Sequence, residues 1–186
     1  NNSTWHLVAD IERIREDLEI ESWMIFGGSW GSTLALIYAQ KYPLVVQHLI
    51  LRGIFLGSQV ELDWFYGGGA GKFWPDAWAR FCNIIPENER FDLIGAYASR
   101  LFCGDLAIET RFGRAWAGWE NSLASIDSNG NPYEAPAQYA RAFSRLENHY
   151  FVNNLFLKPG QEILENMPRL VNTAGHIVQG RYDMIC

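Results

Sequence analysis

The spacing of apolar residues predicts a helix near the start of the chain. Between residues 7 and 18, apolar side chains recur every three or four positions, and charged residues fill most of the gaps. Ser3 and Thr4 precede this stretch, and both are residue types that cap helices. We therefore expect an amphipathic helix. Its apolar face carries Leu7, Val8, Ile11, Ile14 and Leu18.

Strand and helix patterns alternate over the following residues. A short apolar run at residues 22–26 predicts a strand that stops at two glycines. Helical spacing resumes over residues 32–42 and ends before Pro43, and residues 47–51 predict a further buried strand. Because helices and strands alternate, this part of the chain is expected to form a parallel sheet with helices on its faces.

The pattern changes over residues 58–169, which are rich in tryptophan, look helical and show little β-branched alternation. We expect a helical insertion here. A strand pattern returns at residues 176–180 and brings Asp183 to the edge where open α/β sheets place their ligand sites. The expected organisation is therefore a first core part at 1–57, a helical cap at 58–169 and a core strand within 170–186.

Composition narrows the range of partners. The formal net charge is −6, whereas nucleic-acid and anionic membrane surfaces need clustered lysine and arginine. We therefore expect no nucleic-acid or membrane partner. The aromatic load of 8 Trp, 8 Tyr and 11 Phe is high, and so much aromatic surface must be buried or used for binding. Small molecules or peptides are the expected ligands.

Three cysteines without a Cys-x-x-Cys pair indicate neither a disulfide framework nor a zinc site, and free thiols favour a cytoplasmic location. No apolar run is long enough for a membrane span. The glycine-rich run at residues 67–71 lacks the ending of a phosphate-binding loop and predicts a flexible loop instead. No metal or organic cofactor is therefore expected.

The sequence around Ser29 fits the G-x-S-x-G nucleophile elbow, with Gly27 and Gly31 on either side. In this turn between a strand and a helix, the serine hydroxyl stands at the top of the sheet, and the N–H of Trp30 can face a developing oxyanion. The pattern arises by chance in about one chain in twenty of this length. Its position between a predicted strand and a predicted helix favours a catalytic Ser29.

A serine nucleophile needs a histidine base and a carboxylate that orients it. Asp183 is the natural acid, although a turn aspartate is the alternative interpretation. In this fold the histidine follows the acid along the chain, so we expect it beyond residue 183. All four histidines precede that position, and the chain stops soon after a strand, so the sequence is expected to be a fragment without its base. These histidines are His6, His48, His149 and His176. We expect structural roles for His48, which lies within a predicted core strand, and for His176, which opens the last predicted strand.

Several motifs together resemble the proline iminopeptidase (prolyl aminopeptidase) family of the α/β-hydrolase superfamily. They are Gly27–Leu36, Leu51–Phe55, Trp119–Glu120, Glu147–Phe151 and Gly180–Asp183. The resemblance implies an α/β-hydrolase core with a helical cap inserted between its strands. It also implies that Ser29 is the nucleophile, Asp183 the triad acid and the Trp30 N–H half of the oxyanion hole.

By the same resemblance, Glu120 and Glu147 hold the charged N-terminal imino group of the substrate. An ammonium that enters an aromatic pocket loses its water, so buried carboxylates must replace those hydrogen bonds. Without the resemblance, each glutamate would be interpreted as a solvated surface residue. The family positions that line or adjoin the proline ring are matched by Arg52, Phe55, Phe65 and Cys186.

Two further points concern these pocket residues. The family often has tyrosine at the position of Phe65, and phenylalanine supplies no hydroxyl for a contact there. For the aromatic members, ordinary core packing is the alternative interpretation.

The resulting hypothesis is a serine aminopeptidase that releases N-terminal proline from peptides through an acyl-enzyme. Half of the oxyanion hole lies upstream of this chain in the family, so the fragment alone is expected to be inactive. An esterase or a broader aminoacyl amidase keeps the fold with another substrate. A non-catalytic remnant is the third reading. Exposed sheet edges also predict self-association into a homo-oligomer.

Overall fold

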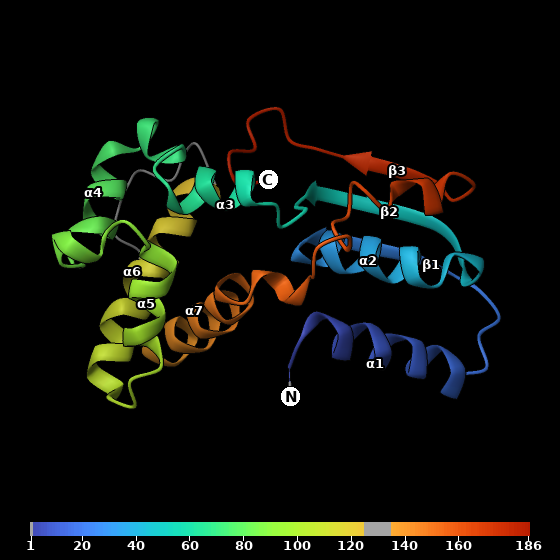
Figure 1. Cartoon of the computed structure of the whole chain (residues 1–186), viewed down its shortest axis with the longest axis horizontal. Helices are drawn as coiled ribbons and strands as arrows, with labels where there is room; N and C mark the ends of the chain where they lie inside the picture. The colour runs from blue at the N-terminus through green and yellow to red at the C-terminus, as the bar shows by residue number, and fades with distance from the viewer. Residues whose placement is uncertain (1, 125–134) are drawn as a thin grey trace. The chain divides into compact units, whose positions relative to one another are not determined.

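The computed structural model describes residues 2–124 and 135–186, which form two compact units (Figure 1). The core unit comprises the chain up to Ser58, Leu155–Arg181 and Cys186. The cap unit comprises Gln59–Asn154 and Tyr182–Ile185. Both units therefore combine segments that are distant in the sequence.

The core unit is built on a parallel sheet of three described strands in the order β1-β2-β3. Helix α2 packs against β1 and β2, and α1 packs against α2 (Figure 1). This confirms the predicted alternation of helix and strand. The elements are α1 (Thr4–Asp17), β1 (Trp23–Ser29), α2 (Trp30–Lys41), β2 (Val46–Ile54) and β3 (Ala174–Val178), with 3-10 turns at Pro43–Val45 and Met167–Leu170.

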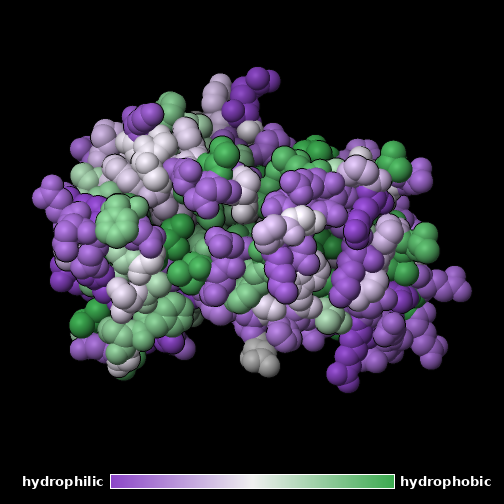
Figure 2. All heavy atoms as spheres, in the orientation of Figure 1, coloured by the Kyte–Doolittle hydropathy of each residue, from purple (hydrophilic) through white to green (hydrophobic). Residues whose placement is uncertain are grey.

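The two sides of this sheet differ in burial. Successive residues of a strand face opposite sides of the sheet, so Leu49 and Leu51 of β2 share a face. Both are buried in the cluster that α2 covers. Met24 and Phe26 of β1 are 59% and 69% exposed. Apolar surface also remains visible in both units from one side (Figure 2).

The histidines of β2 and β3 contact each other. Nε2 of His48 lies 2.7 Å from Nδ1 of His176, although the strand register pairs His48 with Ala174 and His176 with Ile50. His48 had been expected within a core strand, but its side chain is only half-buried. The pair joins the two strands, in keeping with the structural role expected for both histidines.

Helix α1 buries only part of the face that the apolar pattern predicts, with Val8 in the core cluster and Ile11 packed against it. Thr4, Val8 and Glu12 are buried, whereas Ile14 and Leu18 are 53% and 63% exposed. The buried residues are four positions apart and therefore lie on one face of the helix. The prediction was therefore wrong for Ile14 and Leu18, and it missed Glu12, a charged residue that turns inward.

Glu12 can be buried because two partners compensate its charge. The hydroxyl of Tyr38 donates to Glu12 Oε2 at 2.5 Å, and the guanidinium of Arg15 donates to both oxygens at 2.7 and 3.1 Å. The hydrogen bond from Arg15 is the main reason why the pKa of Glu12 is lowered despite burial. A buried charge that is paired in this way is tolerated.

The chain re-enters the core unit through a left-handed turn. Asn154, Leu155 and Phe156 have φ angles of 48°, 55° and 58°, which non-glycine residues rarely adopt in succession. The side chain of Thr4 donates to the carbonyl of Leu155 at 2.5 Å, and the indole of Trp5 donates to that of Phe156 at 2.9 Å. The start of α1 thus holds this turn in place.

This re-entry differs from the predicted boundary at residue 169. The segment that follows Leu155 has no strand pattern, yet Ile163 and Leu170 are buried in the core cluster. Residues Tyr182–Ile185 were expected in the core but belong to the cap unit, where the indole of Trp64 donates to the carbonyl of Met184 at 2.9 Å.

All the regular secondary structure in the described residues of the cap unit is helical, as predicted for the insertion. None of the described helices is long and apolar enough to cross a membrane. The helices are α3 (Gln59–Tyr66), α4 (Pro75–Asn83), α5 (Leu93–Leu101), α6 (Leu106–Ala124) and α7 (Ala137–Val152), with 3-10 turns at Ala70–Lys72 and Glu87–Glu89.

Aromatic side chains form the core of the cap unit. Phe81 stacks on Tyr97 with ring centroids 4.5 Å apart, and Tyr66 stacks on Trp116 at the same distance. Trp116 has no exposed surface. Offset aromatic contacts of this kind add to the free energy gained from burial, so the rings fix the helices relative to one another.

The glycine-rich run at residues 67–71 is packed, which contradicts the expectation of a flexible loop. Ala70 and Gly71 are buried, and Ala70–Lys72 forms a 3-10 turn. A Cβ atom at Gly71 would lie 2.6 Å from the indole ring of Trp78. Gly69 and Gly71 are therefore explained by close approach to the rings of Trp64 and Trp78.

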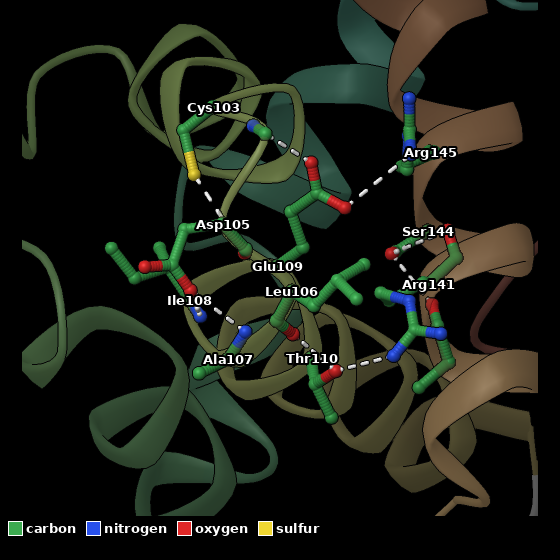
Figure 3. A network of polar contacts seen from close by, with 12 residues as sticks. Cys103, Asp105, Leu106, Ala107, Ile108, Glu109, Thr110, Arg141, Ser144 and Arg145 are labelled. Carbon is green, nitrogen blue, oxygen red and sulfur yellow. Dashed lines mark hydrogen bonds and ion pairs between the residues drawn. The ribbon is translucent and has the colours of Figure 1, made fainter.

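Helices α6 and α7 are held side by side by polar contacts (Figure 3). Near the start of α6, the buried carboxylate of Glu109 forms an ion pair of 3.4 Å with Arg145 of α7. One turn away, Arg141 donates to the hydroxyl of Thr110 at 2.6 Å. Gly113 allows close packing, because a Cβ there would lie 3.0 Å from the carbonyl oxygen of Ala140. This pairing fixes the faces of α6 and α7 that carry Glu120 and Glu147.

Candidate active site

Ser29 occupies a strained turn between a strand and a helix. It is the last residue of β1, and α2 begins at the next residue. Its φ of 54° and ψ of −123° are uncommon for any residue except glycine. Such strain persists only where the surrounding structure imposes it, and it is frequent at functional sites. The predicted elbow is therefore present in the backbone.

One glycine makes this turn possible. A Cβ atom at Gly27 would lie 2.3 Å from the carbonyl oxygen of Gly31, so any side chain there would displace the start of α2. By contrast, a Cβ atom at Gly31 would meet nothing within 4 Å. The close backbone approach therefore requires a glycine at position 27 and not at position 31.

Buried hydroxyl groups tie the elbow to the end of β2. The hydroxyl of Ser32 donates to the carbonyl of Ser29 at 2.6 Å and accepts a hydrogen bond from the N–H of Phe55 at 3.1 Å. The hydroxyl of Thr33 donates to the carbonyl of Phe55 at 2.5 Å. Ser32 and Thr33 are completely buried. These bonds hold the backbone of Ser29 without using its own hydroxyl.

Trp30 lies where an oxyanion donor is expected. It is the first residue of α2, and the first N–H groups of a helix have no acceptor within the helix. The helix dipole also makes this end electropositive. The Trp30 N–H therefore belongs to a helix terminus suited to a developing negative charge.

Three more predicted residues lie next to the elbow. The thiol of Cys186 is 3.7 Å from the hydroxyl of Ser29. Arg52 is opposite Gly28 in the β1–β2 register, and a Cβ at Gly28 would lie 2.7 Å from its guanidinium. Phe55 is buried and is tied to the elbow through its backbone. The core unit thus brings Ser29, Arg52, Phe55 and Cys186 together.

Glu120 and Glu147 lie together in the cap unit. They come from α6 and α7, and their carboxyl groups are hydrogen-bonded to each other. The indole of Trp116 donates to Oε2 of Glu147 at 2.7 Å. Oε2 of Glu120 is buried and receives no hydrogen bond from an amide, indole or hydroxyl donor of the described residues. The prediction that these glutamates share one site is consistent with this geometry.

Burial dominates the electrostatics of this carboxyl pair. Desolvation raises the pKa of Glu147 well above its ordinary value, and the negative charge of Glu120 raises it further. Desolvation also raises the pKa of Glu120, although the hydrogen bond from Glu147 opposes the shift. The pKa of Tyr66, which faces both carboxyls, is raised well above its ordinary value, mainly by burial.

Phe65 and Asp183 also lie in the cap unit. Phe65 is buried, and its carbonyl accepts a hydrogen bond of 3.0 Å from the indole of Trp119. Asp183 follows β3 in a turn, where its Oδ1 accepts a hydrogen bond of 3.1 Å from the N–H of Ile185. Ser29 belongs to the core unit and Asp183 to the cap unit, so the structure of each unit by itself does not test whether the two act together. The role of Asp183 as triad acid stays a prediction.

No histidine of the described residues hydrogen-bonds to Ser29. His6 contacts Ser3, and the histidines of β2 and β3 contact each other. The described residues also contain no cluster of three His, Cys, Asp or Glu side chains that could hold a metal ion. The chemistry available in the core unit is thus a serine hydroxyl beside a helix terminus.

Sequence reasoning missed two residues that shape the candidate site. Trp116 supplies the hydrogen bond to Glu147, and Ser32 fixes the Ser29 carbonyl. A signal for Trp116 was present, because it precedes Glu120 by one helical turn and therefore lies on the same face of α6. Ser32 carries no comparable signal, since its partner Phe55 is distant in the sequence.

Comparison with known proteins places this architecture in a family. A family model described as alpha/beta hydrolase fold matches residues 1–155. The chain therefore belongs to the α/β-hydrolase fold family, which confirms the predicted fold class.

Curated relatives narrow the resemblance. The chain is 49% identical over 188 residues to a proline iminopeptidase of Arabidopsis thaliana, with 100% of this chain and 50% of the relative covered. It is 47% identical over 193 residues to the proline iminopeptidase of Xylella fastidiosa, covering 100% of this chain and 60% of that protein. It is 46% identical over 185 residues to the proline iminopeptidase of Neisseria gonorrhoeae, covering 99% of this chain and 59% of that protein.

These similarities confirm the resemblance drawn from the motifs. The chain spans between half and three-fifths of the length of the curated relatives it matches.

Proposed function

We propose that the protein is a serine aminopeptidase that releases N-terminal proline from peptides through an acyl-enzyme. Support comes from the strained Ser29 elbow in the core unit, from the carboxyl pair in the cap unit and from relatives named proline iminopeptidase. The observation that carries the choice of substrate is the pair formed by Glu120 and Glu147. It offers negative charge in a buried aromatic setting.

In the proposed reaction, the hydroxyl of Ser29 attacks the carbonyl of the N-terminal prolyl residue. The Trp30 N–H stabilises the oxyanion, and a histidine takes the serine proton and returns it to the leaving amine. Asp183 orients that histidine. In this fold the histidine follows the acid along the chain, which assigns the base to a position after Asp183. Water then releases proline by the same route.

The carboxyl pair explains why an N-terminal residue is chosen. The imino group of an N-terminal proline is a secondary ammonium with one positive charge and two N–H donors. Glu120 and Glu147 offer acceptors for both, and Oε2 of Glu120 lacks another donor in the described structure. A proline inside a peptide has neither the charge nor an N–H group, so it would leave the carboxyls unpaired, which is unfavourable.

A second candidate keeps the serine chemistry and changes the substrate to an ester or to other aminoacyl amides. It is favoured only if the carboxyl pair does not contact substrate. The third candidate is a non-catalytic remnant. For the 186-residue chain by itself we expect little or no turnover, because none of its described histidines contacts Ser29 and loss of the base removes most of the rate.

The test uses the chain extended at both ends to the length of its relatives. Hydrolysis of prolyl, alanyl and leucyl arylamides is measured for the parent and for Ser29→Ala, with Ser99→Ala as the matched control. We expect a strong preference for proline, a fall of about 10⁴-fold or more in Ser29→Ala and no change in the control.

Equal rates on the three arylamides would reject proline specificity and favour a broad aminopeptidase. An absence of amide turnover, with hydrolysis of esters retained, would favour the esterase. The 186-residue chain, assayed beside the extended protein, tests the expected inactivity.

A further inference from the structure

We propose that Glu120 and Glu147 share one proton in the free protein and that the ammonium of the incoming substrate displaces it. Binding of an N-terminal proline would then release a proton to solvent. This inference rests on the proposed function, since it concerns the same carboxyl pair. It adds that occupation of the site is linked to pH independently of the catalytic histidine.

The geometry of the pair requires a proton. Two carboxylate anions are both acceptors, and they repel each other at hydrogen-bonding distance. The carboxyls of Glu120 and Glu147 are hydrogen-bonded to each other, so one of them must carry the donor. Trp116 supplies a second hydrogen bond to Glu147, which steadies the oxygen it contacts without neutralising any charge.

Neighbouring groups do not replace the proton. From α3, Tyr66 faces both carboxyls, and it is a neutral phenol. Behind it, Tyr97 of α5 faces Tyr66 and Cys82 of α4 faces Tyr97, both of them uncharged in burial. Among the described residues, no lysine, arginine or histidine contributes to the electrostatic surroundings of either glutamate.

Exchange of the proton for a ligand cation leaves the buried charge unchanged. The free pair, with one shared proton, carries a net charge of −1. When a secondary ammonium binds two carboxylates, the total of −2 and +1 is again −1. The ligand's two N–H groups can replace the carboxyl O–H and also reach Oε2 of Glu120, which receives no hydrogen bond from the described residues. The displaced proton leaves to solvent, and no bond of the ligand is broken.

The exchange predicts a direction for the pH dependence. At a pH where the pair holds its proton and the ligand is an ammonium, each lower pH unit should weaken binding roughly tenfold. Affinity should level off once the free pair loses its proton at higher pH. The burial that raises the pKa of Glu147 moves this change toward neutral pH.

The experiment measures proton release directly. L-Prolinamide is titrated calorimetrically into the extended protein carrying Ser29→Ala, which prevents hydrolysis, in several buffers of equal pH and different ionisation enthalpy. The dependence of the observed heat on buffer enthalpy gives the number of protons released. We expect about one proton per site on the acid side of the transition, and infrared difference spectra should show loss of a protonated carboxyl band.

Two variants and a control locate the proton. Glu120→Gln and Glu147→Gln, each in the Ser29→Ala background, leave a single carboxylate beside an amide, so no shared proton is needed and release should fall to nearly zero. Asp76→Asn makes the same change on the exposed surface of α4 and should leave proton release intact. Thermal melts of all variants verify that they are folded.

The outcomes separate this inference from the proposed function. Binding of prolinamide that depends on both glutamates but releases no proton would overturn the shared proton and leave the aminopeptidase proposal standing. Binding that is insensitive to both substitutions would overturn the role of the pair as substrate anchor. Release that persists in both glutamine variants would assign the proton to another group and would also reject the inference.

Discussion

The core and cap units position their functional groups by different means. In the core unit, Ser29 is placed by its backbone: a glycine permits close approach, and hydroxyl groups hold the turn. In the cap unit, Glu120 and Glu147 are placed by stacked aromatic rings and by the pairing of two helices. The core therefore depends on the absence of side-chain atoms at one position, and the cap depends on large side chains.

Buried glutamates sharpen this contrast. Glu12 in the core unit is paired with Arg15 and Tyr38, and its pKa is lowered, chiefly by the hydrogen bond from Arg15. Glu147 in the cap unit has no cationic partner among the described residues, and desolvation raises its pKa. The carboxyl group of Glu12 therefore has a cationic partner within the fold, whereas that of Glu147 has none among the described residues. A cationic ligand can supply this missing partner.

The largest effect is expected in the aromatic core of the cap. Trp116→Ala removes a completely buried indole that stacks on Tyr66 and donates to Glu147, so it should lower the free energy of unfolding by about 3–5 kcal/mol. Denaturant unfolding followed by circular dichroism gives this value. Trp116→Phe keeps a ring and should lose less. If Trp116→Ala unfolded at the parent's midpoint, the stability of the cap would not depend on its stacked rings.

The next effect tests the backbone argument in the core. Gly27→Ala places a methyl group 2.3 Å from the carbonyl of Gly31, so the elbow must shift, at a cost of about 2–4 kcal/mol and with most of the hydrolytic activity lost. Gly31→Ala is the matched control, because its methyl group meets nothing within 4 Å. Unfolding and arylamide hydrolysis are measured for both. Equal losses in the two variants would reject the close approach as the cause.

The elbow could be predicted from the sequence because its determinants are local. Ser29 and the glycines around it fall within five residues, and the flanking strand and helix follow from apolar periodicity. The apolar pattern could not place Glu12 on the buried face of α1, because Glu12 turns inward only when Arg15 and Tyr38 meet it in the folded chain. The periodicity of apolar residues does not indicate that a charged residue is buried when other side chains pair with it.

The candidate site in the cap was less accessible to sequence reasoning. Glu120 and Glu147 were found through family motifs, since an isolated glutamate on a helix carries no signal of burial. The end of the insertion was placed at residue 169 because residues after Leu155 lack any regular pattern, yet they return to the core. Contacts between distant segments decide both features, and a single sequence does not display them.

The smallest effect has the opposite sign and concerns stability against pH. Above the ordinary glutamate pKa of 4.5, an unfolded Glu147 loses its proton, while the raised pKa keeps the native pair partly protonated. The native state then binds more protons than the unfolded state, so stability falls as pH rises from about 4.5 through the native pKa. Glu147→Gln removes this group and should increase the free energy of unfolding by about 1 kcal/mol at pH 8, with little change at pH 4.

Denaturant unfolding at both pH values, with Asp76→Asn as the exposed control, measures this difference. A higher free energy of unfolding for Glu147→Gln at pH 8 would mean that the carboxyl group of Glu147 destabilises the native cap, as expected of a binding site. A loss of stability at pH 8 would instead mean that Glu147 is held by compensating contacts, as Glu12 is in the core, and the contrast between the two units would no longer hold.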